Sequence, residues 1–437
     1  MNWDLILITL LQFGVPFLII FVFVVAVMLP LMIYMERKVC AYVQDRRGPN
    51  RAAILGIRAF GLVHLFADVL KLLFKEDTEP TAAERFTFRL GPLIVMATVL
   101  VIMAAVPFGE PIDLGHIGPY RAVINMQVVN IPAGILFVFA IASLEVYGMI
   151  IGGWASANKY SFLGAIRGAA QMISYEITLG LAVLGLLIVY SSADLYQIVI
   201  EQSPNPFNWG IVLSFLGFVL FLTASYAETG RNPFDLPEAE SEVVAGYHLE
   251  YSSFKFALFF MGEYASMVVS AAILVTLFMG GWQIPWVSRS ALESNAELVT
   301  MILCAGGAVA LLLAAWATFR ASKRPKRVFG DRRDKEPVIF AGLFGVGGVA
   351  MAVAFVALAA LDVQFPHWLD VTVRVAAQAA SFMAKTFFFS FMFIWVRWTL
   401  PRFRYDQLMK VGWQWMLPIG LANILVTYVW SIEVLGR

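Results

Sequence analysis

The chain has 437 residues, of which 60% are hydrophobic and only 14% are charged, and its net charge is +1. Soluble domains carry about 25% charged residues, so this composition excludes an ordinary soluble enzyme and predicts a protein with many membrane-spanning helices. The two cysteines, Cys40 and Cys304, lack the spacing of a metal site or a disulfide framework, and we expect both to be free thiols.

The first predicted element is a hydrophobic run from Leu5 to Met35 that contains no charged residue. A helix rises about 1.5 Å per residue, so this run is longer than the roughly 30 Å hydrocarbon core of a bilayer requires. We therefore expect a strongly tilted first helix that ends at the charged residues 36–38, with Pro16 and Pro30 as candidate kinks. The N-terminus lacks a basic region and a small-residue (A-x-A) cleavage site, which predicts that this first span is retained.

The next segment, 52–76, follows a basic loop at 44–51 and has the pattern of an amphipathic helix. Its polar residues form one stripe among leucines and phenylalanines: His64, Asp68, Lys71 and Lys75. Such a helix is too polar to span a membrane comfortably, so we expect it to lie at the interface. Two interpretations stay open: a surface anchor, or a helix whose polar stripe faces an internal cavity.

Further apolar runs complete a prediction of about ten transmembrane helices in an all-α polytopic bundle. They lie at about 90–109, 122–144, 177–193, 202–227, 264–288, 298–319, 337–361, 375–396 and 411–432. If the first loop is cytoplasmic, the inside segments hold 26 of the 31 lysines and arginines, as the positive-inside rule requires. Both termini are then expected on the periplasmic side.

The most unusual segment is the acidic stretch at 228–250, which this topology places in the cytoplasm. It holds six acids against the single base Arg231: Glu228, Asp235, Glu238, Glu240, Glu242 and Glu250. Carboxylates crowded at a low-dielectric boundary repel one another, which raises some of their pKa values and makes protons shareable. The pattern favours proton or ion handling, or a docking surface for a basic partner. We expect Arg231 and the basic first loop to supply the counter-charges.

Residues 235–238 also have the pattern of a helix start, with Asp235 as the N-cap and a proline in the first turn. This pattern predicts that Glu238 and Glu242 share one helical face and that Glu240 lies on the other. A solvated acidic helix with a cap is the alternative interpretation of this segment.

Ionisable residues also fall inside predicted spans: Glu145, Glu176, Glu263 and Lys385. Charge at membrane depth is costly, so such groups usually face a bundle interior or a wet cavity and mark a proton or ion path. The alternative for each is a buried ion pair or a snorkelling residue that holds helices together. The chain has no nucleotide-binding glycine loop, zinc motif or C-x-x-C motif, so we expect no metal site or redox cofactor bound by this chain alone.

Several motifs together resemble the H subunit of respiratory NADH:quinone oxidoreductase, or complex I, which corresponds to subunit 1 of the mitochondrial enzyme. They are E-R-K-V at 36–39, R-R-G-P-N-R at 46–51, L-F-A-D-V-L-K-L-L-F-K-E at 65–76, G-W-A-S-A-N-K-Y at 153–160, A-I-R-G-A-A-Q-M-I-S-Y-E at 165–176, A-E-T-G-R-N-P-F-D-L-P-E-A-E-S-E at 227–242, L-E-Y-S-S-F-K-F-A-L-F-F-M-G-E-Y at 249–264 and L-P-R-F-R-Y-D-Q-L-M at 400–409. The resemblance covers 1–280 and 375–432 in collinear order.

The resemblance implies a membrane-arm subunit of a bacterial inner membrane, or an equivalent energy-converting membrane. Such a subunit forms a quinone chamber with peripheral-arm subunits and begins the proton path to small and antiporter-like membrane subunits. Quinone would be the substrate, and FMN and iron–sulfur clusters would lie in partner subunits. Lipids are further expected contacts.

The resemblance also assigns roles to residues. Arg37 and Asp68 would line the quinone channel, with Phe260 near its mouth. Arg231 and the acidic stretch would lie beneath the quinone. The residues implied for the buried proton path are Tyr175, Glu176, Glu250 and Glu263. Glu145 is added to this path because of its membrane depth.

The chain departs from the family at 281–374, where two extra apolar runs are joined by a basic loop. Members commonly have eight spans, so we expect a core at 1–280 with its acidic loop at 228–255, an inserted peripheral hairpin at 281–374, and two last core helices at 375–437. The hairpin is expected to contact lipid or an accessory subunit.

Three alternatives stay open. In the first, the chain is a homologous subunit of a membrane-bound hydrogenase or ferredoxin-linked complex. In the second, it is a free-standing ion transporter. In the third, it is a structural anchor whose carboxylates only dock the peripheral arm. The partner proteins distinguish the first alternative, and transport by the purified single chain distinguishes the second.

Overall fold

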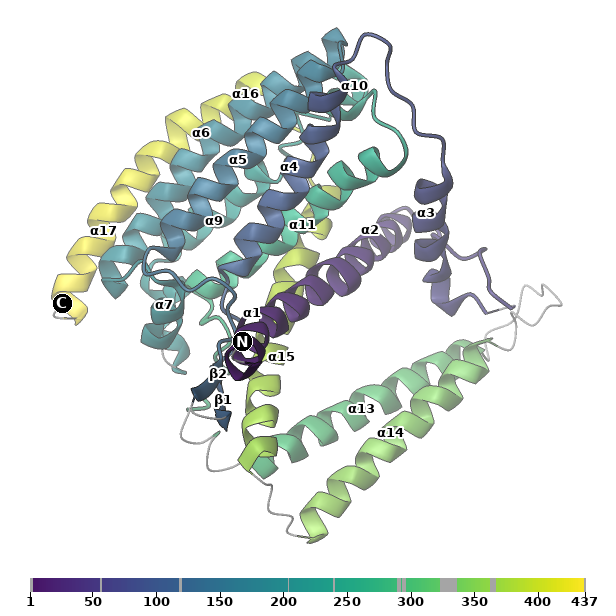
Figure 1. Ribbon diagram of the computed structural model, residues 1–437, viewed down its shortest axis with the longest axis vertical. Coiled ribbons are helices and arrows are strands. Elements are labelled where there is room, and N and C mark those ends of the chain that lie inside the picture. Colours follow the sequence, from purple (N-terminus) through teal and green to yellow (C-terminus); the bar gives the residue numbers. More distant parts are fainter. Residues whose placement is uncertain are drawn as a thin grey trace.

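The computed structural model describes residues 3–55, 57–117, 120–202, 204–238, 240–288, 292, 296–322, 336–361 and 367–435. These residues form long helices packed side by side, with one small β-hairpin (Figure 1). Among them, nine helices are long and apolar enough to cross a membrane. The predicted polytopic helical bundle is therefore confirmed.

The first helix is continuous from Trp3 to Val43 in three pieces: α1 (Trp3–Phe21), the wide-turn segment η1 (Val22–Met28) and α2 (Leu29–Val43). The prediction that the charged residues 36–38 end it is wrong. The helix continues because these charges are satisfied within the protein: Lys38 Nζ donates to the carbonyls of Arg47 (3.1 Å) and Pro49 (2.9 Å).

The predicted helix at 52–76 forms only in its second half, as α3 (Val63–Phe74). Before it, the chain turns back through a bridge between Ile54 and Ile57 and the short turn η2 (Ala59–Gly61). Ala59 and Phe60 have positive φ angles (46° and 57°), which a right-handed helix does not allow, so the helix begins later. Lys75 is extended and lies outside the polar stripe.

The central helices are α4 (Arg85–Ala104), α5 (Gly134–Ala155), α6 (Lys159–Tyr190) and α11 (Ser253–Phe278). They lie at an angle to α1 and α2, as a tilted first helix predicts (Figure 1). Glycines allow close packing here, since a Cβ on Gly91 of α4 would lie 2.9 Å from the Cα of Gly152 in α5.

The connections between these helices contain shorter elements: β1 (Ile112–Ile117) paired antiparallel with β2 (Tyr120–Ile124), α7 (Leu195–Gln202), η3 (Pro206–Asn208), α8 (Gly210–Leu213), α10 (Glu240–Val243) and η4 (Gly246–His248). The predicted span at 122–144 is therefore displaced. Its first residues belong to β2, and the helix α5 begins after Pro132.

The predicted span at 202–227 also differs. Its helical part is α8 followed by α9 (Phe215–Glu228), and the two are separated at Ser214, whose backbone is not helical (φ −136°, ψ 62°). With 14 residues, α9 is about 21 Å long, which is shorter than the hydrocarbon core.

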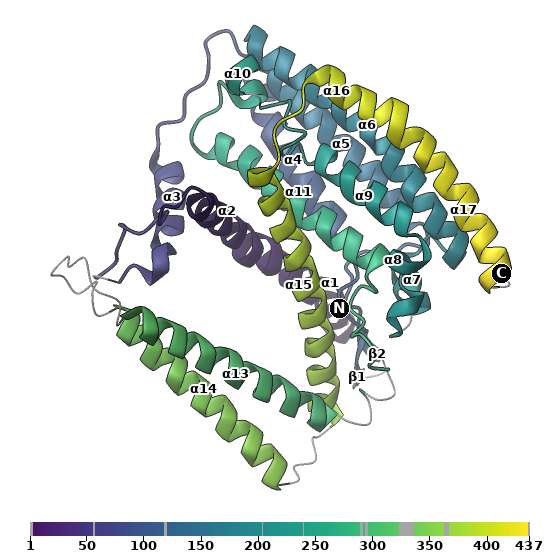
Figure 2. The same ribbon diagram turned by 180° about the vertical axis from the view of Figure 1, so that it is seen from behind.

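The last helices of the bundle are α15 (His367–Thr399), α16 (Tyr405–Lys410), the wide-turn segment η6 (Val411–Met416) and α17 (Leu417–Leu435). Both chain ends lie at one end of the bundle, and α10 lies at the other (Figures 1 and 2).

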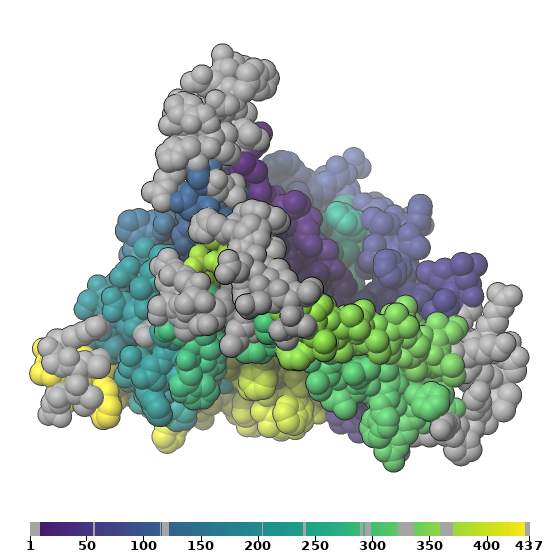
Figure 3. Space-filling model, turned by 90° about the horizontal axis from the view of Figure 1, so that it is seen from below, coloured from purple at the N-terminus to yellow at the C-terminus, as the bar shows by residue number. Residues whose placement is uncertain are grey.

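The extra apolar runs form α13 (Ala296–Ser322) and α14 (Glu336–Leu361), which pack against each other as a helical hairpin. The hairpin stands beside the bundle and forms one flank of the molecule in the space-filling view (Figure 3). Few of its residues are buried. Both helices are apolar on all sides, which is typical of a membrane span.

Candidate functional site

The acidic stretch at 228–250 is packed against the helices rather than exposed as a solvated loop. Gln171 of α6 donates to the carbonyls of Ala227 and Phe234, both at 2.6 Å. The predicted helix start at 235–238 is wrong, and α10 has only four residues. The Asp235 carboxylate accepts a hydrogen bond from Arg402 (2.6 Å) instead of serving as a helix cap.

Arg231 lies at the centre of a buried charge network, and only 1% of its surface is exposed. Its Nε lies 2.9 Å from a carboxylate oxygen of Glu263, and its Nη1 lies 3.4 Å from one of Glu36. The guanidinium also lies over the ring of Tyr264, 4.3 Å from the centroid. The Glu36 carboxylate accepts further hydrogen bonds from the Tyr264 hydroxyl and from Arg397. Two cations thus hold two buried carboxylates.

The charge of Arg231 is stabilised by these neighbours. Burial alone would lower its pKa, but the carboxylates of Glu263 and Glu36 outweigh this effect and raise it. Arg231 therefore stays a cation, and the charge of the network depends on the protonation of its carboxylates.

Two acids of the stretch differ in their electrostatics. Burial, together with the charge of Glu238, raises the pKa of Asp235 to about 7, although Arg402 opposes the shift. Burial would also raise the pKa of Glu238. The hydrogen bond from His248, and the charges of His248 and Arg231, instead hold it below its usual value. Near neutral pH, Asp235 can therefore exchange a proton while Glu238 stays ionised.

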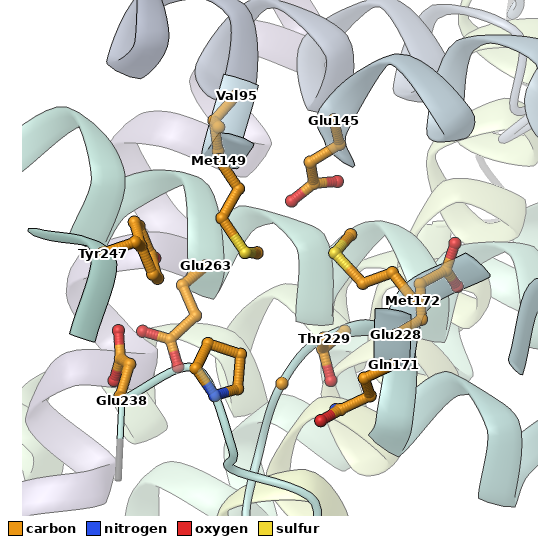
Figure 4. Close-up of a pocket in the computed structure, with 12 residues that line it drawn as sticks. Val95, Glu145, Met149, Gln171, Met172, Glu228, Thr229, Glu238, Tyr247 and Glu263 are labelled. Carbon is orange, nitrogen blue, oxygen red and sulfur yellow. The ribbon is translucent and has the colours of Figure 1, made fainter. Parts of the chain in front are cut away.

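A small cavity of about 30 Å³ brings four of the predicted acids together. Glu238 and Glu263 lie at one side of it, and Glu145 and Glu228 at the other (Figure 4). A second cavity of about 40 Å³ shares Glu145 and Glu228 and extends between α5, α9 and α11. Spaces of this size hold a water molecule or two. The acids therefore line two neighbouring water-sized spaces, and the second of them lies between helices of the bundle.

Ser266 of α11 donates to Glu145 (2.9 Å), and Ser143 of α5 donates to Glu176. The charges of both glutamates act on Glu228. Glu145, Glu176 and Glu228 thus form an electrostatically connected group on three helices.

A larger cavity of about 590 Å³ lies beside α2. Its lining includes two residues of the predicted quinone channel, Arg37 and Phe260. The third, Asp68 of α3, is not part of this lining but forms an ion pair with Arg37. Glu36 and Tyr264 of the Arg231 network form part of the same wall. The volume lies within the range of small-molecule sites.

The remaining predicted residues lie apart from these cavities. Glu242 pairs with Arg167, and Glu250 accepts from the side-chain amide of Asn158 (2.6 Å). Tyr175 is fully buried and donates to the carbonyl of Leu408 (2.9 Å). Glu240 begins α10, but its side chain lies outside the described residues.

The contacts of Lys385 fit the alternative considered above, a residue that holds helices together. Its Nζ donates to the carbonyls of Met279 (2.9 Å), Gly281 (3.0 Å) and Gln283 (2.6 Å), and it lies over the ring of Trp209. These carbonyls follow the C-terminal end of α11, where a cation is favoured by the helix dipole.

Sequence reasoning missed several partners of the acids: Glu36, His248, Tyr264, Arg397 and Arg402. The expected counter-charge Arg231 acts on Glu238 of the stretch and pairs with Glu36 and Glu263. The expectation that the basic first loop supplies the others is wrong for the ion pairs described here, since Glu242 pairs with Arg167 and Asp235 with Arg402. The charged motif at 36–38 is a signal for Glu36, although its composition favours a helix end.

Within the described residues, no cluster of three or more His, Cys, Asp or Glu side chains has a metal-binding arrangement.

The sequence matches one family model and many known proteins. The profile of the NADH dehydrogenase family matches residues 15–428. The first H subunit of the NADH-quinone oxidoreductase of Solibacter usitatus is 37% identical over 398 residues, which cover 90% of each chain. The H subunit of the Bdellovibrio bacteriovorus enzyme is 35% identical over 435 residues, covering 95% of this chain and 94% of the relative. Subunit 8 of the Rhodothermus marinus NADH-quinone oxidoreductase is 35% identical over 90% of each chain.

Proposed function

The chain belongs to the NADH dehydrogenase family as a multi-pass membrane protein of the H-subunit type of NADH-quinone oxidoreductase, and we propose that it forms part of the quinone chamber and the start of a buried proton path. The chamber is the larger cavity beside Arg37 and Phe260. The path begins at the two small cavities that share Glu145 and Glu228. FMN and the iron–sulfur clusters belong to partner subunits.

One observation supports this proposal most strongly: the Arg231 network connects the two kinds of cavity. Glu36 lines the larger cavity, and Glu263 lines the small one. Arg231 contacts both carboxylates. A change of charge in the larger cavity is therefore transmitted to the first acid of the path through one shared cation.

The direction of this coupling follows from electrostatics. Reduction of a quinone to a quinol consumes two protons and develops negative charge on the quinone oxygens before those protons arrive. Negative charge in the larger cavity attracts Arg231 and weakens its hold on Glu263. A buried carboxylate with less compensation takes up a proton more readily. Quinone reduction thus draws a proton into the small cavity.

Asp235 is suited to supply such protons. Its pKa of about 7 lets it release and regain a proton near neutral pH. It lies three residues before Glu238, which lines the small cavity. The acidic stretch therefore serves as a proton reservoir, and docking of the peripheral arm is a second function of the same surface.

Replacement of Glu263 by Gln in the complete complex tests the proposal. The variant keeps the shape of the side chain and removes its charge. We expect NADH:quinone turnover to fall about a hundredfold or more, because a positioned proton-transfer group contributes a factor of about 10²–10⁴. Glu84→Gln, on an exposed residue, is the matched control. Wild-type turnover and wild-type proton pumping in Glu263→Gln would contradict the proposed path.

We further propose a bacterial inner membrane, or an equivalent energy-converting membrane, with both termini on the periplasmic side. The grouping of both chain ends at one end of the bundle supports this topology (Figure 2). The names of the relatives favour NADH-linked partners over a hydrogenase. Co-purification from the native membrane tests this choice, since an NADH-binding flavin subunit is expected and a nickel–iron subunit would contradict it.

A further inference from the structure

The hairpin of α13 and α14 meets the rest of the protein at both of its ends. At one end, α13 packs against α15. At the other, the start of α14 reaches the turn η2, just before α3 (Figures 1 and 2). The second contact involves a buried charge, although the hairpin itself is otherwise apolar and mostly exposed.

The buried charge is Glu336, the first residue of α14, which is 4% exposed. One carboxylate oxygen lies 2.9 Å from Nε of Arg58. The other accepts a hydrogen bond from the backbone N–H of Phe60 (3.2 Å). An acid at a helix N-terminus is also favoured by the helix dipole. Both oxygens are therefore used to hold a segment 276 residues away in the sequence.

Phe60 is held from three directions. Its N–H is bound by Glu336, and its carbonyl accepts from the Tyr34 hydroxyl of α2 (2.9 Å). Its ring packs on Phe340, one turn after Glu336 on α14, with 5.0 Å between centroids. These contacts hold the residue in a left-handed conformation (φ 57°) that a phenylalanine rarely adopts. A conformation of this kind persists only when its surroundings impose it.

The turn at Phe60 determines where α3 begins. His64, in the first turn of α3, accepts hydrogen bonds from the backbone N–H groups of Arg51 (3.2 Å) and Ala52 (3.1 Å). His64 and Arg51 both line the larger cavity. A displacement of the turn would therefore move one wall of that cavity.

We propose that the α13–α14 hairpin is a strut that positions the rim of the quinone chamber, with Glu336 as its positioning residue acting through Phe60 and His64. This inference rests on the proposed function and adds a specificity element to it. The cavity of about 590 Å³ accommodates a quinone head group and the first part of its tail. A long apolar tail must extend beyond the cavity and past its rim. The strut thus determines how well a long-tail quinone enters, whereas a short-tail quinone needs the cavity alone.

The test uses the complete complex in proteoliposomes with two substrates: the long-tail quinone of the host membrane and an analogue with a single isoprenoid unit. Glu336→Gln keeps an acceptor for Phe60 but loses the charge that faces Arg58. We expect KM for the long-tail quinone to rise about three- to tenfold, a factor that corresponds to the net contribution of one ordinary hydrogen bond. KM for the short-tail analogue and kcat for both substrates are expected to stay within about twofold.

Two further variants separate positioning from general damage. The exchange Arg58→Glu with Glu336→Arg restores an ion pair and is expected to recover part of the long-tail KM. Leu343→Ala, on an exposed face of α14, is the matched control and should leave both substrates unchanged. Amide hydrogen exchange at 57–62 should increase in Glu336→Gln, because the weaker contact with Arg58 loosens the turn.

An equal rise of KM for both quinones, or unchanged KM together with unchanged exchange at 57–62, would overturn the strut. So would a failure of the exchanged pair to recover any long-tail KM. These outcomes differ from a failure of the proposed function, because that failure would appear as absent quinone reduction in the unmodified complex.

Discussion

The Arg231 network and the α13–α14 hairpin differ in how their buried charges are paired. In the network, charges from α2, α11, α15 and the acidic stretch lie together, and the carboxylates of Glu36 and Glu263 share the cation Arg231. In the hairpin, two apolar helices face outward, and the buried charge of Glu336 is used by a neighbouring turn. Shared charges make a region responsive to a neighbour's protonation. A charge with its own separate partner fixes the position of a segment, but it does not make that segment respond to a neighbour's protonation.

The comparison predicts that removal of the shared cation has the largest effect. Arg231→Met leaves Glu36 and Glu263 buried without their common partner. Loss of one member of a buried pair costs about 3–5 kcal/mol, so we expect poor assembly and turnover below a few per cent in what assembles. The measurements are subunit content by gel and NADH:quinone turnover per assembled complex.

Arg231→Lys should recover assembly better than turnover, since an ammonium group does not reproduce the planar contacts to two carboxylates. Normal turnover in Arg231→Met would show that the network is not needed, and the contrast with the hairpin would then be lost.

A smaller effect is expected at Lys385, which is buried but separate from the network. Lys385→Met removes three hydrogen bonds to carbonyls after α11. Each hydrogen bond to a charged group contributes about 1.5–3 kcal/mol, and part of this loss is offset by the apolar replacement. We expect a lower melting temperature of the purified complex with turnover within about twofold of wild type. A selective loss of pumping at unchanged stability would instead place Lys385 on the proton path.

A pH-dependent effect is expected at Asp235. Its folded pKa of about 7 lies above the ordinary value of 3.8, so the folded state holds this proton more tightly than the unfolded chain does. Stability should therefore fall as pH rises from about 4 to about 7, with a limiting slope near 1.4 kcal/mol per pH unit.

Asp235→Asn has no such proton and should flatten this slope. Thermal unfolding of the complex, measured between pH 5 and 8 at intervals of about one pH unit, gives this slope of stability against pH. Identical slopes in the two proteins would show that Asp235 titrates elsewhere.

The smallest effect is expected on the outer face of the hairpin. Val346 of α14 is 73% exposed, so Val346→Ala should change stability by about 0.5 kcal/mol or less and leave turnover unchanged. The check is melting temperature together with turnover. A large loss would indicate that this face is covered by another subunit rather than by lipid.

Sequence alone predicts the features that depend on local composition. Long uncharged runs indicate membrane helices, and six acids in one stretch indicate a proton-handling segment. Glu145, Glu228, Glu238 and Glu263 are all candidates on these grounds, and the structure brings the four around one cavity. Their roles in proton transfer remain a proposal.

Features that depend on distant partners are not predictable in this way. Arg397 and Glu36 are separated by 361 positions, and neither the spacing nor the composition of either segment specifies the pair. The same reason explains why the helix end predicted at 36–38 is wrong. Charged residues after an apolar run indicate a helix end in the sequence, and only their distant partners show that the helix continues. The left-handed turn at Phe60 depends likewise on Glu336, 276 residues later.

The small volumes beside Glu145 and Glu228 have a consequence for the membrane itself. Spaces of about 30 and 40 Å³ hold only a water molecule or two. A hydrated sodium ion does not enter them with its shell of waters intact, so it would have to exchange those waters for oxygens of the lining. A proton needs no such exchange, because it moves as a rearrangement of bonds between a water and a carboxylate. A path made of these spaces would therefore favour protons over hydrated metal cations, so that salt leaks slowly across the membrane while energy is conserved across it.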